Sequence, residues 1–237
     1  MGNFEFQFIQ FGLNHSNSTM KIGTDAIVLG SLVENNQANS ILEIGTGCGI
    51  ISLMLAQRFQ AKITAVEIDT RSAKQALDNI STSPWKKKIE VVQGDIRILN
   101  LSKKFDLIVS NPPYFQNDLR PDSSSKNQAR HSETLTFDEL CQTSSAHLAE
   151  NGHLWIILPP RGFEQFSNKA SKHSFYCTKQ IDIFPSIQHS RTLIVSKWGK
   201  EKESMKKSRF HLRNINGTYS DEYQKATRAF HPNIFNQ

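Results

Sequence analysis

Three glycines follow an apolar run in the stretch ILEIGTGCGI, residues 41–50. Glycine adopts backbone torsion angles that other residues resist, and it lets the chain approach a ligand closely. Gly45, Gly47 and Gly49 therefore predict a tight ligand-binding turn between a buried strand and a helix. The dinucleotide-binding pattern G-x-G-x-x-G would need a glycine at position 50, where the chain has Ile50. The spacing does not favour a dinucleotide.

Short apolar runs alternate with helical patterns along much of the chain. Strands are expected at residues 40–44, 62–68, 88–94, 104–110, 153–159 and 191–198. Helices are expected at residues 51–59, 71–80 and 136–150. This alternation predicts an α/β fold, with a mostly parallel sheet covered by helices on both faces. Thr136 and Glu139 have the spacing of a capping box at the start of the last of these helices.

The composition is typical of a globular chain that forms one domain. The 237 residues are 38% hydrophobic and 21% charged, and no apolar run reaches the roughly 18 residues that a membrane span needs. The N-terminal residues lack the basic start and apolar core of a signal peptide. Cys48, Cys141 and Cys177 are scattered, which disfavours a disulfide framework and a zinc site. We therefore expect a cytoplasmic protein without a metal and without a membrane partner.

The positive charge is concentrated in the second half of the chain. The net charge is +6, and residues 111–237 hold 17 Lys/Arg against 12 Asp/Glu. Such an excess attracts polyanions, although it is also compatible with an ordinary solvated surface. Residues 197–213 hold seven Lys/Arg against two Glu. Residues 116–131 are polar and rich in serine, which is compatible with a lid or with a mobile insertion.

Acidic residues stand at or just beyond the ends of three expected strands. Glu43 precedes the glycine loop, Glu67 lies at the end of the second strand, and Asp95 follows the third. Ligands of open α/β sheets bind at the carboxyl ends of the strands. A carboxylate at the position of Glu67 can accept hydrogen bonds from ribose hydroxyls, and one at Asp95 from an adenine amino group. The pattern therefore favours an adenosyl compound.

The fourth strand is followed by SNPPYF, residues 110–115. Two adjacent prolines cannot continue a helix or a central strand, so Pro112 and Pro113 predict a rigid loop between Asn111 and Tyr114. On its own this loop is equally compatible with an ordinary turn.

Together, E-x-G-x-G-x-G, the acid at the end of the second strand, the GD pair and NPPY resemble the class I S-adenosyl-L-methionine-dependent methyltransferases. The resemblance implies a seven-stranded sheet whose last strand is antiparallel, with FYCTKQIDIF and RTLIVSKW as the terminal hairpin. It also implies that S-adenosyl-L-methionine is the cofactor. In this superfamily NPPY accompanies methylation of a planar, conjugated nitrogen in adenine, in cytosine or in a glutamine amide.

An NPPY loop suits such a nitrogen for a physical reason. The lone pair of an exocyclic amino group is delocalised, which makes the nitrogen a poor nucleophile. The side-chain oxygen of Asn111 and the carbonyl of Pro112 can each accept one of its N–H bonds and so localise the lone pair. Tyr114 offers a ring on which a flipped-out base can stack. Asn111, Pro112, Pro113 and Tyr114 are thus the expected catalytic residues.

Three functions remain open for this loop. The first is adenine N6 methylation of RNA, the second is glutamine N5 methylation of a protein, and the third is a non-catalytic adenosyl-binding module. Protein glutamine methyltransferases usually carry a helical domain before the catalytic fold, whereas about 40 residues precede the glycine loop here. DNA adenine methyltransferases need an added recognition domain. A small chain with a basic second half favours a folded RNA.

Three further stretches resemble the tRNA1(Val) (adenine-N6)-methyltransferase family. They are MKIGTDAIVLGSLV (20–33), SPWKKKIEVVQGDI (83–96) and ARHSETLTFDEL (129–140). The resemblance implies a tRNA substrate, methylated at the adenosine 3′ to the anticodon, and no obligate protein partner is evident.

The lead-in, residues 20–33, would pack over the cofactor, with Lys21, Thr24 or Asp25 near its methionine end. Thr24 or Asp25 could also be the N-cap of a buried helix, and the two interpretations are compatible. We expect one methyltransferase domain over residues 1–237, in which residues 1–38 cap the cofactor and residues 197–237 form a basic C-terminal extension.

Overall fold

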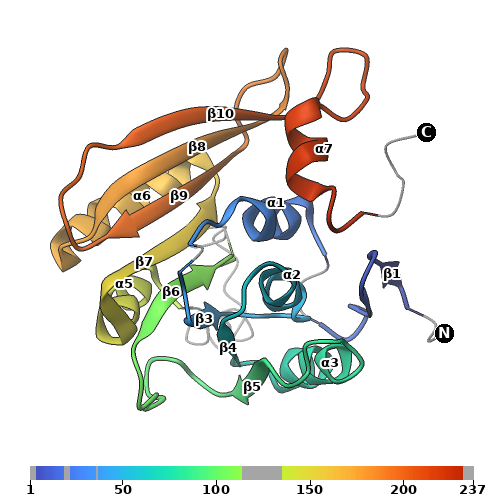
Figure 1. Ribbon diagram of the computed structural model, residues 1–237. Coiled ribbons are helices and arrows are strands. Elements are labelled where there is room, and N and C mark those ends of the chain that lie inside the picture. The colour runs from blue at the N-terminus through green and yellow to red at the C-terminus, as the bar shows by residue number, and fades with distance from the viewer. Residues whose placement is uncertain (1–3, 19–21, 36, 114–134, 232–237) are drawn as a thin grey trace, which may run out of the picture.

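The computed structural model describes residues 4–18, 22–35, 37–113 and 135–231. An eight-stranded sheet crosses the molecule with helices on both faces, as Figure 1 shows. The strand order is β10-β8-β9-β7-β6-β3-β4-β5. A separate hairpin of β1 (Phe6–Gln7) and β2 (Gly12–Leu13) lies near the N-terminus. The expected α/β class is confirmed.

The strands of the main sheet are β3 (Ser40–Ile44), β4 (Lys62–Glu67), β5 (Ile89–Gln93), β6 (Phe105–Ser110), β7 (Leu148–Leu158), β8 (Tyr176–Ser186), β9 (Leu193–Gly199) and β10 (Lys206–Arg213). The helices are α1 (Thr24–Leu32), α2 (Ile50–Arg58), α3 (Thr70–Ser81), α5 (Phe137–His147), α6 (Pro160–Ala170) and α7 (Asp221–Thr227), with a short 3-10 turn η1 (Ser171–His173). Every strand and helix expected from the sequence is present, most of them within two residues of the expected bounds.

The sheet is parallel from β5 to β7 and changes direction at β9. β9 pairs antiparallel with both β7 and β8, so the expected terminal hairpin is β8–β9. The expected count of seven strands is one short, because residues 206–213 form β10, which pairs parallel with β8 along the edge. Within β10, Phe210 is buried while its basic neighbours are exposed. With a single buried residue, this strand lacks the alternation of apolar and polar residues by which the others were predicted.

Two hydrophobic layers hold the helices to the sheet. On one face, Trp155 and Ile157 of β7 pack among residues of α1 and α2, and Tyr223 of α7 packs on Phe210 of β10. On the other face, residues of α5 and α6 pack on Leu154 and Ile156 of the same strand. Alternate residues of one strand thus serve both layers, as expected for a central strand covered on both sides.

Local sequence sets the starts of the helices beside the carboxyl edge, which is the edge where β3, β4, β5 and β6 end. The expected capping box is present at α5, where the backbone N–H of Glu139 donates to the Thr136 hydroxyl at 3.2 Å and the Glu139 carboxylate accepts the N–H of Thr136 at 2.8 Å. Asp69 caps α3 by accepting the N–H of Ser72 at 2.8 Å. Each cap provides a partner for backbone groups that a helix leaves unpaired.

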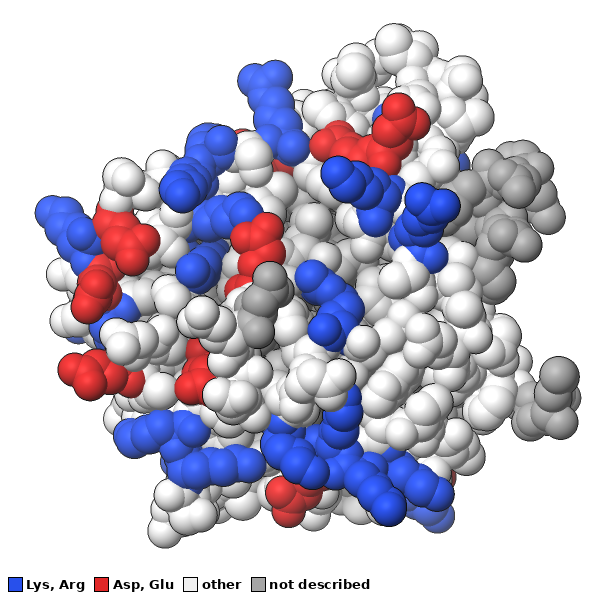
Figure 2. Space-filling view, in the orientation of Figure 1, with Lys and Arg blue, Asp and Glu red and all other residues white. Residues whose placement is uncertain are grey.

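Charged side chains gather unevenly on the face drawn in Figure 2. Lys and Arg form a band along the lower edge of that view, below β4 and β5, whereas both signs mix around β8 and β10. Lys62 begins β4, and Lys86, Lys87 and Lys88 precede β5, so four lysines stand at the amino ends of these strands. This end of the sheet is opposite the carboxyl edge.

None of the helices in the described ranges has the length and apolar character that spanning a membrane requires. The same ranges contain no cluster of three or more His, Cys, Asp or Glu side chains that could hold a metal ion.

Candidate active site

The expected site residues gather at the carboxyl edge. Ile44 of β3 pairs with Val66 of β4 on one side and with Ser110 of β6 on the other. The next residue of each strand is therefore at the same height along the strands. These residues are Gly45, Glu67 and Asn111. The strand order reverses between β3 and β6, and such a reversal opens a crevice for a ligand in sheets of this kind.

The glycine loop has the unusual backbone that its sequence predicts. Gly45, Gly47 and Gly49 have φ angles of +77°, +57° and +88°, a region that other residues adopt at a cost. The N–H groups of Gly45 and Thr46 both donate to the carbonyl of Val66, at 2.9 and 3.1 Å. The loop is thereby fastened to β4, and Gly49 leads directly into α2.

Glu43 lies beneath this loop and is almost fully buried. Its Oε2 accepts the hydroxyl of Thr46 at 2.7 Å and also that of Ser52. Its Oε1 has no hydrogen-bond partner within the described ranges. Burial raises the pKa of Glu43 to about 7. The side chain fixes the shape of the loop from below.

Glu67 is buried at the end of β4 and joins two loops. Its Oε2 accepts the N–H of Gly47 at 2.8 Å, and its Oε1 accepts the N–H of Asp69 at 3.0 Å. Burial raises the pKa of Glu67, and these two backbone donors act in the opposite direction. A carboxylate oxygen can accept a second hydrogen bond. Beside it, Ile68 is 39% exposed.

Asp95 is held by a residue that the sequence analysis did not single out. Arg97 donates from Nε and Nη2 to the Asp95 carboxylate at 2.6–2.9 Å, and from Nη1 to Glu139 at 3.2 Å. The hydrogen bond from Arg97 holds the pKa of Asp95 below its usual value. The spacing Asp-x-Arg was the only signal for this pair, and it is weak. The link to Glu139 depends on tertiary structure.

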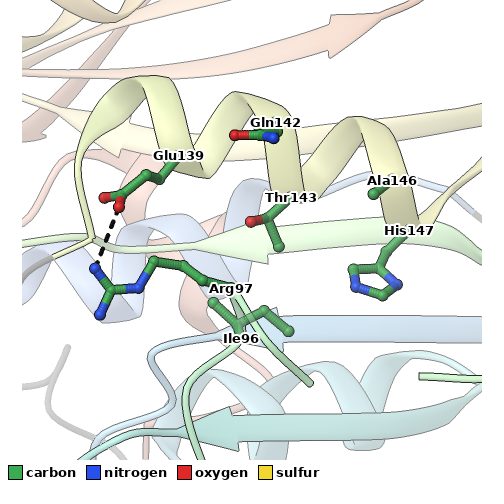
Figure 3. A pocket seen from close by; sticks show the side chains of 7 residues that line it. All are labelled: Ile96, Arg97, Glu139, Gln142, Thr143, Ala146 and His147. Carbon is green, nitrogen blue, oxygen red and sulfur yellow. Dashed lines mark hydrogen bonds and ion pairs between the residues drawn. The ribbon is translucent and has the colours of Figure 1, made fainter. Parts of the chain in front are cut away.

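A hollow of about 210 Å³ lies between the loop that follows β5 and helix α5. Figure 3 shows Arg97 reaching across to Glu139 at one end of it, with His147 at the other. The lining residues are Ile96, Arg97, Glu139, Gln142, Thr143, Ala146 and His147. The hollow adjoins the carboxyl edge through Ile96 and Arg97, which follow Asp95 in the chain.

The proline loop begins in a fixed position. The Ser110 hydroxyl donates to the carbonyl of Ile44 at 2.9 Å, which ties the end of β6 to β3. Asn111 is half-buried, Pro112 is buried and Pro113 is exposed. Tyr114 and the polar stretch 116–131 lie outside the described residues.

The lead-in meets the proline loop directly. Asn111 donates from Nδ2 to Oδ2 of Asp25 at 3.2 Å. Thr24 is exposed at the start of α1, and Lys21 lies outside the described residues. The expectation that Thr24 or Asp25 caps this helix is wrong, because the N-cap is Gly23 and makes no side-chain bond.

Earlier residues of the N-terminal segment are fastened beside the glycine loop. The N–H of Asn14 donates to Oδ1 of Asn79 at 2.9 Å, and Nδ2 of Asn79 donates to the carbonyls of Asn14 and Cys48, each at 2.8 Å. Asn79 is buried in α3. Its amide thus joins the N-terminal segment to the loop between β3 and α2.

Comparison with known sequences gives consistent matches over nearly the whole chain. The family model described as methyltransferase small domain matches residues 10–165. The chain is 40% identical over 231 residues to the tRNA1(Val) (adenine(37)-N6)-methyltransferase of Bacteroides fragilis (strain YCH46), covering 95% of this chain and 97% of that protein. It is 35% identical to the protein of the same name from Histophilus somni (strain 129Pt), over 97% and 98% of the two chains.

Solved structures share the fold at low sequence identity. A protein described as a predicted O-methyltransferase from Agrobacterium tumefaciens superposes with a TM-score of 0.70 at 18% identity, covering 89% of this chain and all of that one. The glycopeptide N-methyltransferase MtfA, solved with (S)-adenosyl-L-methionine, has a TM-score of 0.57 at 13% identity, over 79% and 98% of the two chains. At such identities these similarities show the fold alone.

Proposed function

Because this chain belongs to the tRNA1(Val) (adenine(37)-N6)-methyltransferase family, we propose that it methylates N6 of adenine 37 in a valine tRNA. It is an adenine-N6 methyltransferase of tRNA. The observation that carries this conclusion is the identity of 40% over 95% of the chain, together with an intact Asn-Pro-Pro sequence at the carboxyl edge of the sheet.

The proposed methyl donor is S-adenosyl-L-methionine, which carries its reactive methyl group on a sulfonium. The carboxyl edge fits this molecule. The loop is open at Gly45, where no atom of the described residues lies within 4 Å of the position that a Cβ would take, whereas Gly49 packs against Ala76 and Ile80 of α3. Glu67 would present a buried carboxylate to a ribose. Ile68 offers an apolar surface to an adenine ring, and Asp95 accepts its amino group.

For the methionine end we propose the backbone of the glycine loop, together with Lys21 and Thr24 of the lead-in. Glu43 supports that end from beneath. Residues 1–38 would then cover the cofactor within a single domain. The bond between Asn14 and Asn79 supports this placement, because it holds the N-terminal segment against the glycine loop.

Asn111 and Pro112 would act on the acceptor. The Asn111 oxygen and the Pro112 carbonyl each accept one N–H of the adenine amino group, so that its lone pair points toward the methyl group. The N–C bond forms as the S–C bond breaks, and the surplus proton on the nitrogen passes to solvent. Since that proton is acidic after transfer, no strong base is needed. Pro113 stiffens the loop, and we propose that Tyr114 stacks on the base.

The two alternative functions are not favoured. A protein glutamine methyltransferase would use the same loop, but the named relatives match over nearly their full length and act on tRNA by name. A non-catalytic module would not need Asn111 and Pro112 at the end of β6. The partner is therefore tRNA, which places the enzyme in the cytoplasm in this proposal.

We propose that residues 197–237, and β10 in particular, contact tRNA phosphates. Lys206, Lys207 and Arg209 are exposed on this edge strand. Residues 206–213 pair with β8, so they are part of the sheet and not a solvated tail. Lys207 also lies 3.5 Å from Asp182, which offsets part of its charge. Phosphate contacts of this kind position a nucleic acid without reading its bases.

The deciding experiment incubates the protein with labelled S-adenosyl-L-methionine and total tRNA, and then maps the modified nucleoside. The expected product is N6-methyladenosine at position 37 of the valine tRNA. Label in a protein glutamine, or no transfer to tRNA, would overturn the proposal. A matched reaction with Asn111→Ala controls for a contaminating methyltransferase.

A further inference from the structure

Asp25 and Asn111 are 86 residues apart in the chain but lie in contact beside the proline loop. Oδ2 of Asp25 accepts a hydrogen bond from Nδ2 of Asn111 at 3.2 Å. The other oxygen, Oδ1, accepts the N–H of Ala26 at 2.9 Å within the first turn of α1. One carboxylate thus joins the helix of the lead-in to the residue that follows β6.

The chemistry of the pair fixes which way the asparagine amide is turned. An ionised carboxylate only accepts hydrogen bonds, whereas an amide has a donating and an accepting end of nearly the same shape. Asp25 therefore requires the NH2 group of Asn111 on its own side. The side-chain oxygen of Asn111 must then point to the opposite side of the amide.

We infer that Asp25 is a positioning residue that selects the productive orientation of the Asn111 amide. This inference rests on the proposed function, in which Asn111 accepts a hydrogen bond from the amino group of adenine. With the amide reversed, an NH2 group would meet the amino group of the substrate, and two donors would oppose one another. Asp25 thereby determines that the site takes a base with a hydrogen-bond donor at this position.

Asp25→Asn tests this role with little change in shape. The new amide can still accept from Ala26 through its oxygen, and it then presents its own NH2 group to residue 111. Asn111 would turn over to offer its oxygen, leaving its NH2 group toward the substrate. We expect kcat for tRNA methylation to fall about ten- to a hundredfold, as for a misplaced catalytic group, while the melting temperature and the affinity for S-adenosyl-L-methionine stay near wild type.

A charge swap separates positioning from a general structural role. Asn111→Asp alone places two carboxylates against each other, so this variant should be nearly inactive. The double variant Asp25→Asn, Asn111→Asp restores one donor and one acceptor, with a carboxylate oxygen again facing the substrate. We expect its kcat to exceed that of both single variants. Such recovery cannot come from a side chain that merely stabilises α1.

Glu164→Gln is the matched control, because it removes one exposed carboxylate from α6, outside the lead-in and the carboxyl edge, and it should leave kcat unchanged. Wild-type kcat in Asp25→Asn, or a double variant no better than the single variants, would overturn the inference. Failure of the wild-type protein to methylate tRNA would instead overturn the proposed function, and the inference with it.

Discussion

The guanidinium of Arg97 spans two carboxylates, donating to both oxygens of Asp95 and to Oε1 of Glu139. Glu139 belongs to the capping box of α5, so the orientation of Asp95 is coupled to the start of that helix. An aspartate held in this way keeps its charge and its direction before a ligand arrives. Preorganised groups lose less freedom on binding.

Arg97 orients Asp95 but is not itself a proposed contact of the cofactor. Arg97→Gln should therefore weaken S-adenosyl-L-methionine binding indirectly. We expect a loss of about 1 kcal/mol, roughly fivefold in Kd, since the carboxylate of Asp95 would no longer be oriented. Isothermal titration calorimetry measures the change. Tighter binding by the variant would mean that Arg97 competes with the cofactor for Asp95.

Glu67→Ala should weaken cofactor binding more strongly, by roughly 1.5–3 kcal/mol, because hydrogen bonds to a charged acceptor are lost. Since Glu67 also holds the N–H groups of Gly47 and Asp69, the melting temperature must be measured beside the calorimetry. Glu67→Gln keeps the shape and is the matched variant. Unchanged affinity in a folded Glu67→Ala protein would remove this residue from the site.

Asn111→Ala should separate chemistry from binding. We expect cofactor affinity to stay within a few-fold of wild type while single-turnover methylation of tRNA falls at least about a hundredfold, as for loss of a group aimed at the transition state. Rapid-quench measurement with saturating enzyme reports the chemical step. Parallel losses in affinity and rate would make the loop a structural turn.

Glu43 should make the stability of the cofactor-free protein depend on pH. Burial raises the pKa of Glu43 from 4.5 to about 7, so the folded state binds this proton more tightly than the unfolded state. The stabilisation is fully present below pH 4.5 and is lost as the pH rises through about 7. We expect the free energy of unfolding to fall by on the order of 3 kcal/mol across this window.

Glu43→Gln carries no titrating proton and tests the assignment. Urea denaturation at several pH values should give this variant a flatter profile than wild type. Some slope should remain, since burial also raises the pKa of Glu67 and acts in the same direction. A profile as steep as that of wild type would assign the effect to other groups.

Neutralising β10 should reduce tRNA affinity and its dependence on salt. With Lys206, Lys207 and Arg209 changed together to Gln, we expect the log–log salt slope to flatten by about two to three units, at roughly 0.7–0.9 per phosphate contact. Filter binding over a range of salt concentrations gives the slope, and cofactor affinity should not change.

The matched control is a triple change before β5 and β6, Lys86, Lys87 and Lys103 to Gln, which removes the same charge from exposed positions away from β10. It should leave the slope near wild type. A larger effect from this control than from β10 would place the tRNA surface at the amino ends of β5 and β6.

The sequence predicted those parts of the site that depend on residues close together in the chain. The apolar strands, the three glycines and the acids at strand ends are local patterns, and parallel pairing necessarily brought Glu67 and Asn111 to one edge. The contact between Asp25 and Asn111 and the link from Arg97 to Glu139 could not be predicted. Each joins segments that only tertiary packing brings together.

Helices α6 and α7, the turn η1, the hairpin β1–β2 and the strand β10 were also not predicted. Strands β1 and β2 have only two residues each, too few to show a pattern. Helix α6 begins with Pro160, and a proline after an apolar run indicates the end of a strand but does not by itself predict a helix. Helix α7 has only seven residues. The strand β10 is basic at most of its exposed positions, so its alternation is visible only around Phe210. The density of charge in residues 206–213 suggested a solvated segment. In the structure, this segment is a strand because its backbone pairs with β8.

The placement of β10 also bears on self-association. An edge strand presents a row of backbone N–H and C=O groups on which another chain could extend the sheet, and lysine or arginine along such an edge opposes that pairing. Lys206, Lys207, Arg209 and Arg213 stand along this margin. The positive charges that we propose to bind tRNA would thus have a second effect. They would keep two copies of the enzyme from pairing edge to edge and growing into fibrils.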